Sequence, residues 1–419
     1  MKNKFAFKVV NCDIRFLSFA LLLLLQEKCY YLIPFSWFYV VNGNQQQIVM
    51  VLISISSFFL MLLMHKIKQT KFAFIALSVF FCCYIAAFAY SVNTNRQSIL
   101  DIFISSNYFL MIFAFPIVFF VIREKGIISF LKEIIFLSFI NVIVCWLQYI
   151  GAGFGFIFTK MNLEGSRFGA LRIWDMSETL TCVGVIASFA LFLYMETKER
   201  YMYLFIYILG LLGNVFVSKG RIVLIGILLS SIFIALYRFK RNAISFFIVF
   251  IAVLILLWTI PSTSIGKMYF SSFGQVETDT ASIRMREYNY YWKQIYSNPI
   301  WGGGFIRDNG DSASIILRGP TGQYSRTDVG LIGVWNTIGL SGILWFLLVH
   351  VRFLYVLINR WSYFSSFDRS ILVSLLVFSI VLMPTMAMFS SFSITTFIII
   401  FAIFENYALK EGKDESTVD

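Results

Sequence analysis

Five arginines stand in hydrophilic segments between long apolar runs, and their side chains are the ones best suited to binding an anion: Arg167, Arg172, Arg221, Arg284 and Arg286. A guanidinium group binds phosphate through two parallel N–H donors. Arg221 ends the turn Ser218-Lys219-Gly220-Arg221 directly before an apolar run, so we expect it at a helix N-terminus, whose free N–H groups also favour anions. The five arginines are therefore candidate ligands of a diphosphate. The alternative is that they snorkel to a membrane surface or form local ion pairs.

Two carboxylates in the later part of the chain are candidates for proton transfer. Asp328 stands where a long hydrophilic segment returns to an apolar run, and it is the first candidate for a general base. Glu287, within the same segment, is the second candidate. Because aspartate is a favoured N-cap, Asp328 could equally cap the helix that follows, and the two roles are compatible.

The elements that must position these residues are predicted to be membrane helices. Of the 419 residues, 59% are apolar and only 13% are charged, about half of the roughly 25% typical of soluble domains. Apolar runs long enough to cross a bilayer lie near residues 16–40, 46–65, 72–91, 100–122, 127–150, 177–196, 201–217, 220–237, 243–260, 329–351, 370–388 and 391–408. We therefore expect an all-α polytopic membrane protein with about twelve transmembrane helices. Gln26-Glu27-Lys28 interrupts the first run, which is either one tilted helix or a helix followed by a re-entrant piece.

The basic residues orient these helices. Twenty of the 34 Lys and Arg residues fall at the two termini and in every second gap, whereas the short gaps on the other side hold seven. Since basic loops stay on the cytoplasmic side, both termini are predicted to be cytoplasmic. The net charge of +12 then largely reflects topology, and we expect no nucleic acid partner.

One hydrophilic segment is long, and parity places it outside the membrane. Residues 1–260 hold spans one to nine, 261–328 form the large external loop, 329–408 hold spans ten to twelve, and 409–419 form a cytoplasmic tail. A long loop among short connections usually carries function. Its aromatic cluster around Tyr288 to Trp292 argues against the alternative of a mobile tether. We expect an amphipathic helix lying on the membrane, followed by a plain turn at Gly302-Gly303-Gly304, because no Lys-Ser/Thr follows the glycines as in a P-loop.

Several classes of chemistry lack their residues. His65 and His350 are both assigned to cytoplasmic ends of spans, so an external histidine base or histidine-ligated metal is not expected. The six cysteines form no CxxC pair and are interpreted as small buried hydrophobes. The absence of a Walker motif argues against an ATP-driven pump.

Taken together, these stretches resemble the O-antigen polymerase/ligase superfamily, which contains Wzy-like repeat-unit polymerases, WaaL-like ligases and related exopolysaccharide polymerases. Order and spacing agree over about residues 160–345. The matching positions are Arg167 in Arg-Phe-Gly, the turn at 218–221, Arg284 to Tyr288 with Pro299, Gly302 and Gly304, and Asp328 with Gly339 and Gly342. Three positions depart from the family pattern: Arg221 comes one residue late, Tyr288 replaces a tryptophan, and Asp328 stands where ligases carry a histidine.

The resemblance implies a membrane enzyme with one large periplasmic loop in the bacterial inner (cytoplasmic) membrane. It would polymerise repeat units linked to undecaprenyl diphosphate into O-antigen or a related surface polysaccharide, with the arginines binding the carrier diphosphate. Such a glycosyltransferase needs no cofactor, neither ATP nor a metal. A flippase and a chain-length regulator of the same pathway are the implied partners.

Two alternatives remain open at this point. A ligase of the same superfamily would pass the glycan to another acceptor, and the missing histidine argues against it. A transporter of lipid-linked glycans without catalysis would suit twelve spans. However, transporters tend to carry charged or broken helices at the membrane midplane, whereas the unusual charges here lie at the predicted outer face and in one late loop.

Overall fold

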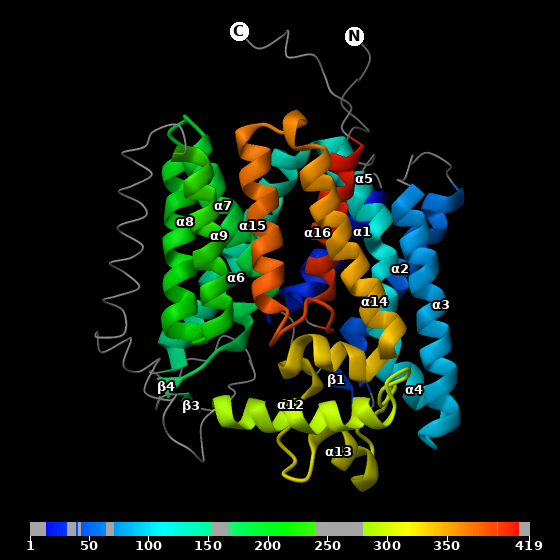
Figure 1. Cartoon of the computed structure of the whole chain (residues 1–419). Coiled ribbons are helices and arrows are strands. Elements are labelled where there is room, and N and C mark those ends of the chain that lie inside the picture. The colour runs from blue at the N-terminus through cyan, green and yellow to red at the C-terminus, as the bar shows by residue number, and fades with distance from the viewer. Residues whose placement is uncertain are drawn as a thin grey trace, which may run out of the picture.

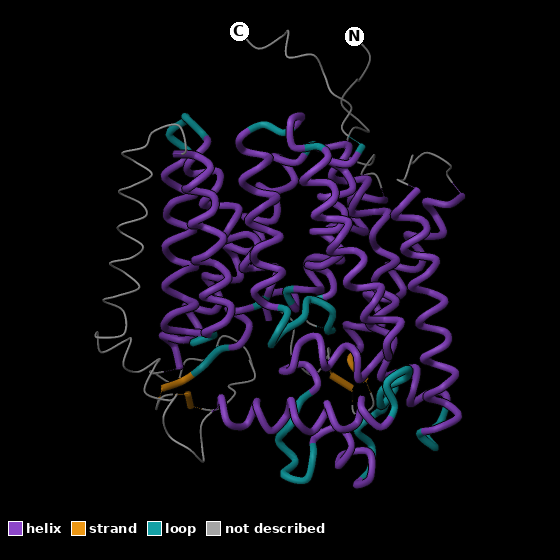
Figure 2. Tube along the Cα trace, in the orientation of Figure 1, coloured by secondary structure: helices purple, strands orange, loops and turns teal. Residues whose placement is uncertain are grey.

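The computed structural model describes residues 14–31, 39–40, 43–63, 71–152, 166–167, 170–239, 280–391 and 393–409. The apolar run near 243–260 and the first part of the large loop, 261–279, lie outside these residues. Nearly all of the described chain is helical, with two pairs of two-residue strands (Figure 2). These antiparallel pairs are β1 (Tyr39–Val40) with β2 (Gly43–Asn44) and β3 (Ser166–Arg167) with β4 (Ala170–Leu171).

The helices stand side by side in one bundle, as Figure 1 shows. In chain order they are α1 (Ile14–Gln26), α2 (Gln45–Leu63), α3 (Lys71–Thr94), α4 (Ile99–Ser106), the 3-10 helix η3 (Asn107–Ala114), α5 (Phe115–Lys125), α6 (Ile127–Ala152), α7 (Thr179–Tyr194), α8 (Arg200–Gly213), the π-helix η5 (Asn214–Ser218), α9 (Arg221–Phe239), α14 (Gly330–Asn359), α15 (Ser366–Leu382) and α16 (Ile394–Ala408). The expected all-α membrane architecture is confirmed by this arrangement.

Within the described residues, six helices are long and apolar enough to cross a membrane: Lys71–Thr94, Ile99–Lys125, Ile127–Gly151, Arg200–Ser218, Arg221–Phe239 and Arg326–Asn359. Four shorter apolar helices accompany them: Arg15–Gln26, Gln46–Phe59, Thr179–Tyr194 and Ile394–Ala408. Helix α15 covers the run predicted near 370–388. The expected count of about twelve spans is therefore not confirmed, although each described apolar run of the sequence has become a helix.

Helices α3 and α16 show how the bundle divides between lipid and core. On α3, the buried positions Ala73, Ala76, Leu77, Phe80, Tyr84 and Ala87 recur at helical spacing, while Phe74, Ile75, Val79, Phe81 and Ile85 are exposed. Because both faces of α3 are apolar, one face packs against protein and the other faces lipid tails. The inner face meets α14, since Trp345 donates its indole N–H to the Ala76 carbonyl at 2.7 Å. Every residue from 394 to 405 of α16 is buried, so α16 lies in the centre.

One end of the bundle carries a crosswise layer that holds most of the loop. Helix α12 (Thr280–Ser297) lies across this end, and the short α13 (Asp311–Arg318) lies beyond it (Figure 1). Tyr290 and Gln294 of α12 donate hydrogen bonds to the carbonyls of Ile315, at 2.7 Å, and Ile316, at 3.1 Å. These bonds satisfy carbonyls at the C-terminal end of α13. The predicted helix in the loop is thus confirmed, and its position on the membrane surface stays a prediction.

Helix α14 joins this crosswise layer to the bundle through a sharp bend at Gly339. Gly339 has a φ of 79° and a ψ of −173°, which only glycine adopts readily. Before the bend, residues 330–338 lie alongside α12, and after it the helix runs up the bundle (Figure 1). Leu340 donates its backbone N–H to the Ile300 carbonyl at 2.9 Å, and a Cβ on Gly339 would come within 2.2 Å of that oxygen.

The glycine triplet fits around the same bend. Gly302 and Gly304 have positive φ angles of 65° and 71°. The backbone N–H groups of Gly303 and Gly304 both donate to the Asn336 carbonyl, at 2.8 and 3.2 Å. The triplet is therefore a turn that binds the carbonyl at the bend of α14, as expected, and its N–H groups point at protein rather than at a phosphate.

The first apolar run does break at Gln26-Glu27-Lys28. Helix α1 ends at Gln26, and Lys28, Cys29 and Tyr30 take left-handed backbone conformations with φ between 48° and 54°. The one-helix interpretation of residues 16–40 is therefore wrong for the stretch up to residue 31. Whether a re-entrant piece follows concerns residues 32–38, which lie outside the described chain.

Candidate functional site

Glu287 of α12 and Asp328 form the acidic centre of the crosswise layer. Asp328 lies in the 3-10 helix η8 (Arg326–Val329), directly before α14. The backbone N–H of Ser325 donates to Oε1 of Glu287 at 3.2 Å, and the N–H of Asp328 donates to the Ser325 carbonyl at 3.1 Å. The turn at 325–328 thus brings together the two carboxylates that the sequence suggested as proton acceptors.

The surroundings of Glu287 raise its pKa to about 7. Burial is the largest cause, because Glu287 is only 2% exposed, and the negative charge of Asp328 adds to it. The Ser325 N–H and the positive charge of Arg284 oppose the shift. A carboxyl group with a pKa near neutrality holds and releases a proton readily at cellular pH, as a general acid–base requires.

The arginines of α12 divide between two environments. Arg284 precedes Glu287 by three residues, so the two share one face of the helix, and Arg284 is half-buried. Arg286 is exposed. Tyr288, the first aromatic residue of this helix, donates its hydroxyl to the Pro384 carbonyl in the connection between α15 and α16. The helix is therefore anchored with Arg284 and Glu287 toward the protein.

The interpretation of Asp328 as a helix cap is wrong. The N-cap position of α14 is Val329, and no side chain caps this helix. Ser325 supplies the nearest side-chain cap, since its Oγ accepts from the Thr327 N–H at 3.3 Å at the start of η8. Gly330 separates the two helices and packs so closely on Met383 that a Cβ would come within 2.0 Å of the Met383 carbonyl oxygen.

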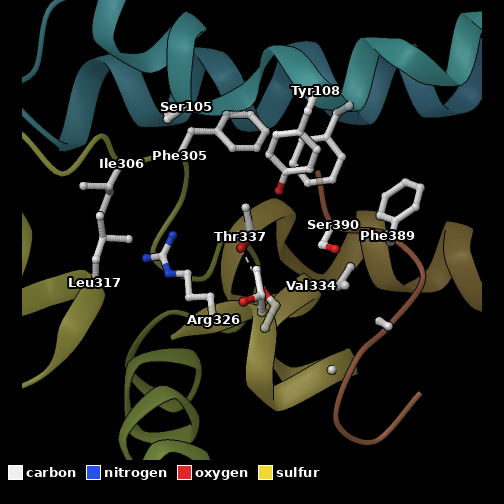
Figure 3. Close-up of a pocket in the computed structure, with 15 residues that line it drawn as sticks. Ser105, Tyr108, Phe305, Ile306, Leu317, Arg326, Val334, Thr337, Phe389 and Ser390 are labelled. Atoms are coloured by element: carbon white, nitrogen blue, oxygen red, sulfur yellow. Dashed lines mark hydrogen bonds between the residues drawn. The ribbon is translucent and has the colours of Figure 1, made fainter. Parts of the chain in front are cut away.

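A cavity of about 130 Å³ opens beside η8, and Arg326 points into it (Figure 3). Its walls come from η3, the 305–306 segment, the first part of α14 and the connection between α15 and α16. Nη1 of Arg326 donates to the Gly304 carbonyl at 2.7 Å. Nε and Nη2 are buried and have no hydrogen-bond partner among the described residues.

Sequence reasoning missed Arg326. It is one of seven basic residues between positions 261 and 328, and no motif singles it out. Its position two residues before Asp328 was the one available signal. What distinguishes it is burial against Gly303 and Gly304, which depends on the folding of the loop: a Cβ on Gly303 would lie 2.5 Å from Nη2 of Arg326.

The segment that carries Arg172 contacts the turn that precedes Arg221. Arg172 donates its Nε–H to the Ser218 carbonyl at 2.7 Å and stacks on Trp174 at 3.8 Å. The predicted turn before α9 is present: Lys219 takes a left-handed conformation with a φ of 53°, and α9 begins at Arg221. The two arginine-bearing segments that the sequence placed in separate gaps are therefore adjacent, at the same end of the bundle as α12 (Figure 1).

The acidic residues near Arg172 pair with a distant lysine. Asp175 forms an ion pair with Lys28, and Glu178 lies 3.8 Å from the same ammonium group. Thr181 donates to Glu27 at 3.2 Å, which completes a buried polar cluster between α1 and α7. Arg167 lies in β3, where it pairs with Ala170, and its side chain is outside the described part of the chain.

Fold and site define a class: a helical, multi-spanning membrane protein whose ionisable groups gather at one end of its bundle. Within this class, residues 206–347 match the family model described as O-antigen ligase. This match confirms the resemblance to the O-antigen polymerase/ligase superfamily. The matched range contains Arg221, Arg284, Glu287, Arg326 and Asp328. No curated protein matches the sequence.

Proposed function

We propose that the chain is a polysaccharide polymerase, a glycosyltransferase that joins repeat units carried on undecaprenyl diphosphate. It would move the growing chain from its carrier to a hydroxyl of a new lipid-linked unit at the outer face of the inner membrane. The observation that carries this proposal concerns Glu287 and its neighbour Asp328. Glu287 has a pKa of about 7 and lies on α12, the helix across the end of the bundle.

The reaction needs one proton acceptor and one group of cations. The acceptor hydroxyl attacks the anomeric carbon of the donor sugar, forming a C–O bond as the bond from that carbon to the diphosphate oxygen breaks. Glu287 takes the hydroxyl proton, and its burial, followed by the charge of Asp328, raises its basicity. This reverses the order expected from sequence, in which Asp328 was the first candidate.

The leaving diphosphate carries negative charge away from the sugar, and fixed cations stabilise that charge best. Arg284 stands one turn from Glu287 on the same helix face. Arg172 binds the Ser218 carbonyl in the turn before α9, and Arg221 begins α9 three residues after Ser218. We assign the carrier diphosphate to these arginines, with Arg167 and Arg286 as outer members of the set. The proposal uses no metal and no nucleotide, because the lipid–phosphate bond supplies the energy.

The experiment compares surface glycan in a deletion strain complemented with wild type, Glu287→Gln or Arg284→Ala. A polymerase predicts single-repeat glycan and no long chains in both variants. The matched control is Lys293→Ala, which removes an exposed cation from the same helix and should leave chain length unchanged. Wild-type chain lengths in Glu287→Gln would refute the assignment of the proton acceptor.

Ligase activity is the second candidate, and the description of the matched family favours it. A ligase would use the same donor and the same acid centre but pass the glycan to a different acceptor. The deletion strain separates the two: long polymer retained on the carrier indicates a ligase, whereas only single repeat units indicate a polymerase. Polymer formation by the purified protein in proteoliposomes would also exclude the transporter alternative.

A further inference from the structure

The cavity beside η8 has a property that the diphosphate assignment does not explain: it contains a charged group with unused donors. Nε and Nη2 of Arg326 are buried without a hydrogen-bond partner among the described residues, while Nη1 is bound to the Gly304 carbonyl. Buried N–H groups of a charged side chain are costly to leave unpaired, and native structures nearly always satisfy them. The guanidinium group therefore indicates an anion that enters the cavity.

The other walls show what kind of molecule carries that anion. Tyr108, Phe305 and Phe389 supply aromatic rings, and Figure 3 shows the Tyr108 hydroxyl pointing to the same space as the Arg326 guanidinium group. Thr337 and Ser390 add hydroxyl groups. A phosphate ion needs cations and N–H donors but no rings. A sugar ring uses all three kinds of wall: its C–H face packs on the rings, its hydroxyls bind hydroxyls, and a carboxylate binds the guanidinium group.

The position of the cavity relates it to the acceptor rather than the donor. Arg326 and Asp328 both belong to the four-residue helix η8, and Ser325 directly before it binds Glu287. A sugar in the cavity thus lies against the element that carries Asp328 and that is joined to Glu287 through Ser325. Of the arginines assigned to the carrier diphosphate, Arg221 lies at the α9 turn, which packs against the segment that carries Arg172, whereas Arg284 lies near Glu287, where donor and acceptor must meet.

We propose that this cavity is the acceptor-sugar subsite, an inference that rests on the proposed function. The subsite selects a sugar that bears a carboxylate, and Arg326 binds that carboxylate. The wall contributed by α14 keeps its shape because the glycine turn binds the bend of that helix through Asn336. The repeat unit of this protein is accordingly one whose acceptor end contains an acidic sugar.

The test measures binding separately from polymerisation. The full-length protein in lipid nanodiscs is unfolded thermally with sodium glucuronate, with glucose plus sodium chloride, or with sodium phosphate, all at equal ionic strength. We expect glucuronate alone to raise the unfolding temperature. Equal stabilisation by glucose would overturn carboxylate selection, and stabilisation by phosphate as large as that by glucuronate would assign the cavity to the carrier and overturn the acceptor role. No shift with any of the three overturns the proposal.

Variants locate the binding. Arg326→Gln should abolish the glucuronate shift, whereas Arg318→Gln should keep it, since Arg318 is 55% exposed and paired with Asp308 outside the cavity. Thr337→Phe keeps Arg326 but fills the cavity from the α14 wall, so it should also abolish the glucuronate shift. If Arg326→Gln does not fold, Thr337→Phe alone tests whether glucuronate binds in the cavity. Retained binding in either cavity variant overturns the assignment. Glu287→Gln should still bind glucuronate, so a failure of the catalytic proposal and a failure of the subsite give different results.

Discussion

Ser325 donates its backbone N–H to the carboxylate of Glu287 at 3.2 Å, across a gap of 38 residues in the sequence. This bond fixes α12 against the turn that leads into α14. It also places the carboxylate where burial and the charge of Asp328 both act on it.

The first prediction concerns the pH dependence of the reaction. A base acts when deprotonated, so the rate of polymer formation in proteoliposomes should rise from pH 6 to pH 8 with a midpoint near the Glu287 pKa of about 7. Asp328→Asn removes a negative charge and should move this midpoint to lower pH. Glu287→Gln should lower the rate about 10²- to 10⁴-fold, the usual contribution of a general base. An unchanged midpoint in Asp328→Asn would contradict the coupling.

The second concerns stability. The folded-state pKa of Glu287 lies above its ordinary value of 4.5, so the folded protein binds more protons than the unfolded chain between pH 4.5 and about 7. The contribution of Glu287 to stability therefore falls as pH rises through this window. Glu287→Gln should unfold at a higher temperature than wild type at pH 8 and show little gain at pH 4. A gain of equal size at both pH values would show that the carboxyl charge is not the cause.

The third concerns the bend in α14. Gly339→Ala would force alanine into a backbone conformation that favours glycine, and it would place a Cβ 2.2 Å from the Ile300 carbonyl oxygen. Gly126 has a matching positive φ of 77° and an extended ψ of 155°, but open space around its Cβ position, so Gly126→Ala is a control for the cost of the positive φ. Conformational strain of this kind costs about 1–3 kcal/mol. Gly339→Ala should lower the unfolding temperature clearly more than Gly126→Ala, and equal losses would show that the contact with Ile300 is dispensable.

The fourth concerns metals. Because the arginines are assigned the leaving diphosphate, polymer formation by the purified protein should continue at an unchanged rate in EDTA. Restoration of a lost rate by added Mg²⁺ or Mn²⁺ would assign part of that charge stabilisation to a metal ion. The same measurement is made on Arg284→Ala and Lys293→Ala, each of which removes one positive charge from α12. A lower rate of polymer formation in Arg284→Ala alone would show that the position of the cation matters and not the total charge.

The sequence predicted the elements better than their contacts. Apolar runs of membrane length mark the helices, and the aromatic segment after Arg284 marks the surface helix α12. Glu287 and Asp328 were both singled out from residue type and position. However, the cap at Asp328 was wrong, because the chain turns at Gly330 against Met383, a contact that no local pattern encodes.

The buried groups were the hardest to foresee, since burial depends on partners far away in the chain. Arg326 is enclosed by the turn at 303–304 and by η3, more than 200 residues earlier. Asp175 lies only three residues from Arg172 in the sequence, yet it forms an ion pair with Lys28, 147 residues away. Charge patterns along a sequence identify which residues need a partner, but three-dimensional packing decides which partner they find.

The bend at Gly339 has one more consequence for a lipid-linked substrate. Helix α14 runs along the boundary of the bundle up to residue 338 and then enters it, so one continuous helix forms both a wall of the cavity and part of the membrane-embedded core. In the reaction proposed above, the tail of the carrier stays among lipids, so the substrate would search for the site by two-dimensional diffusion in the plane of the membrane. The place of the bend along α14 would then determine how far from the lipid tail the reactive bond must lie.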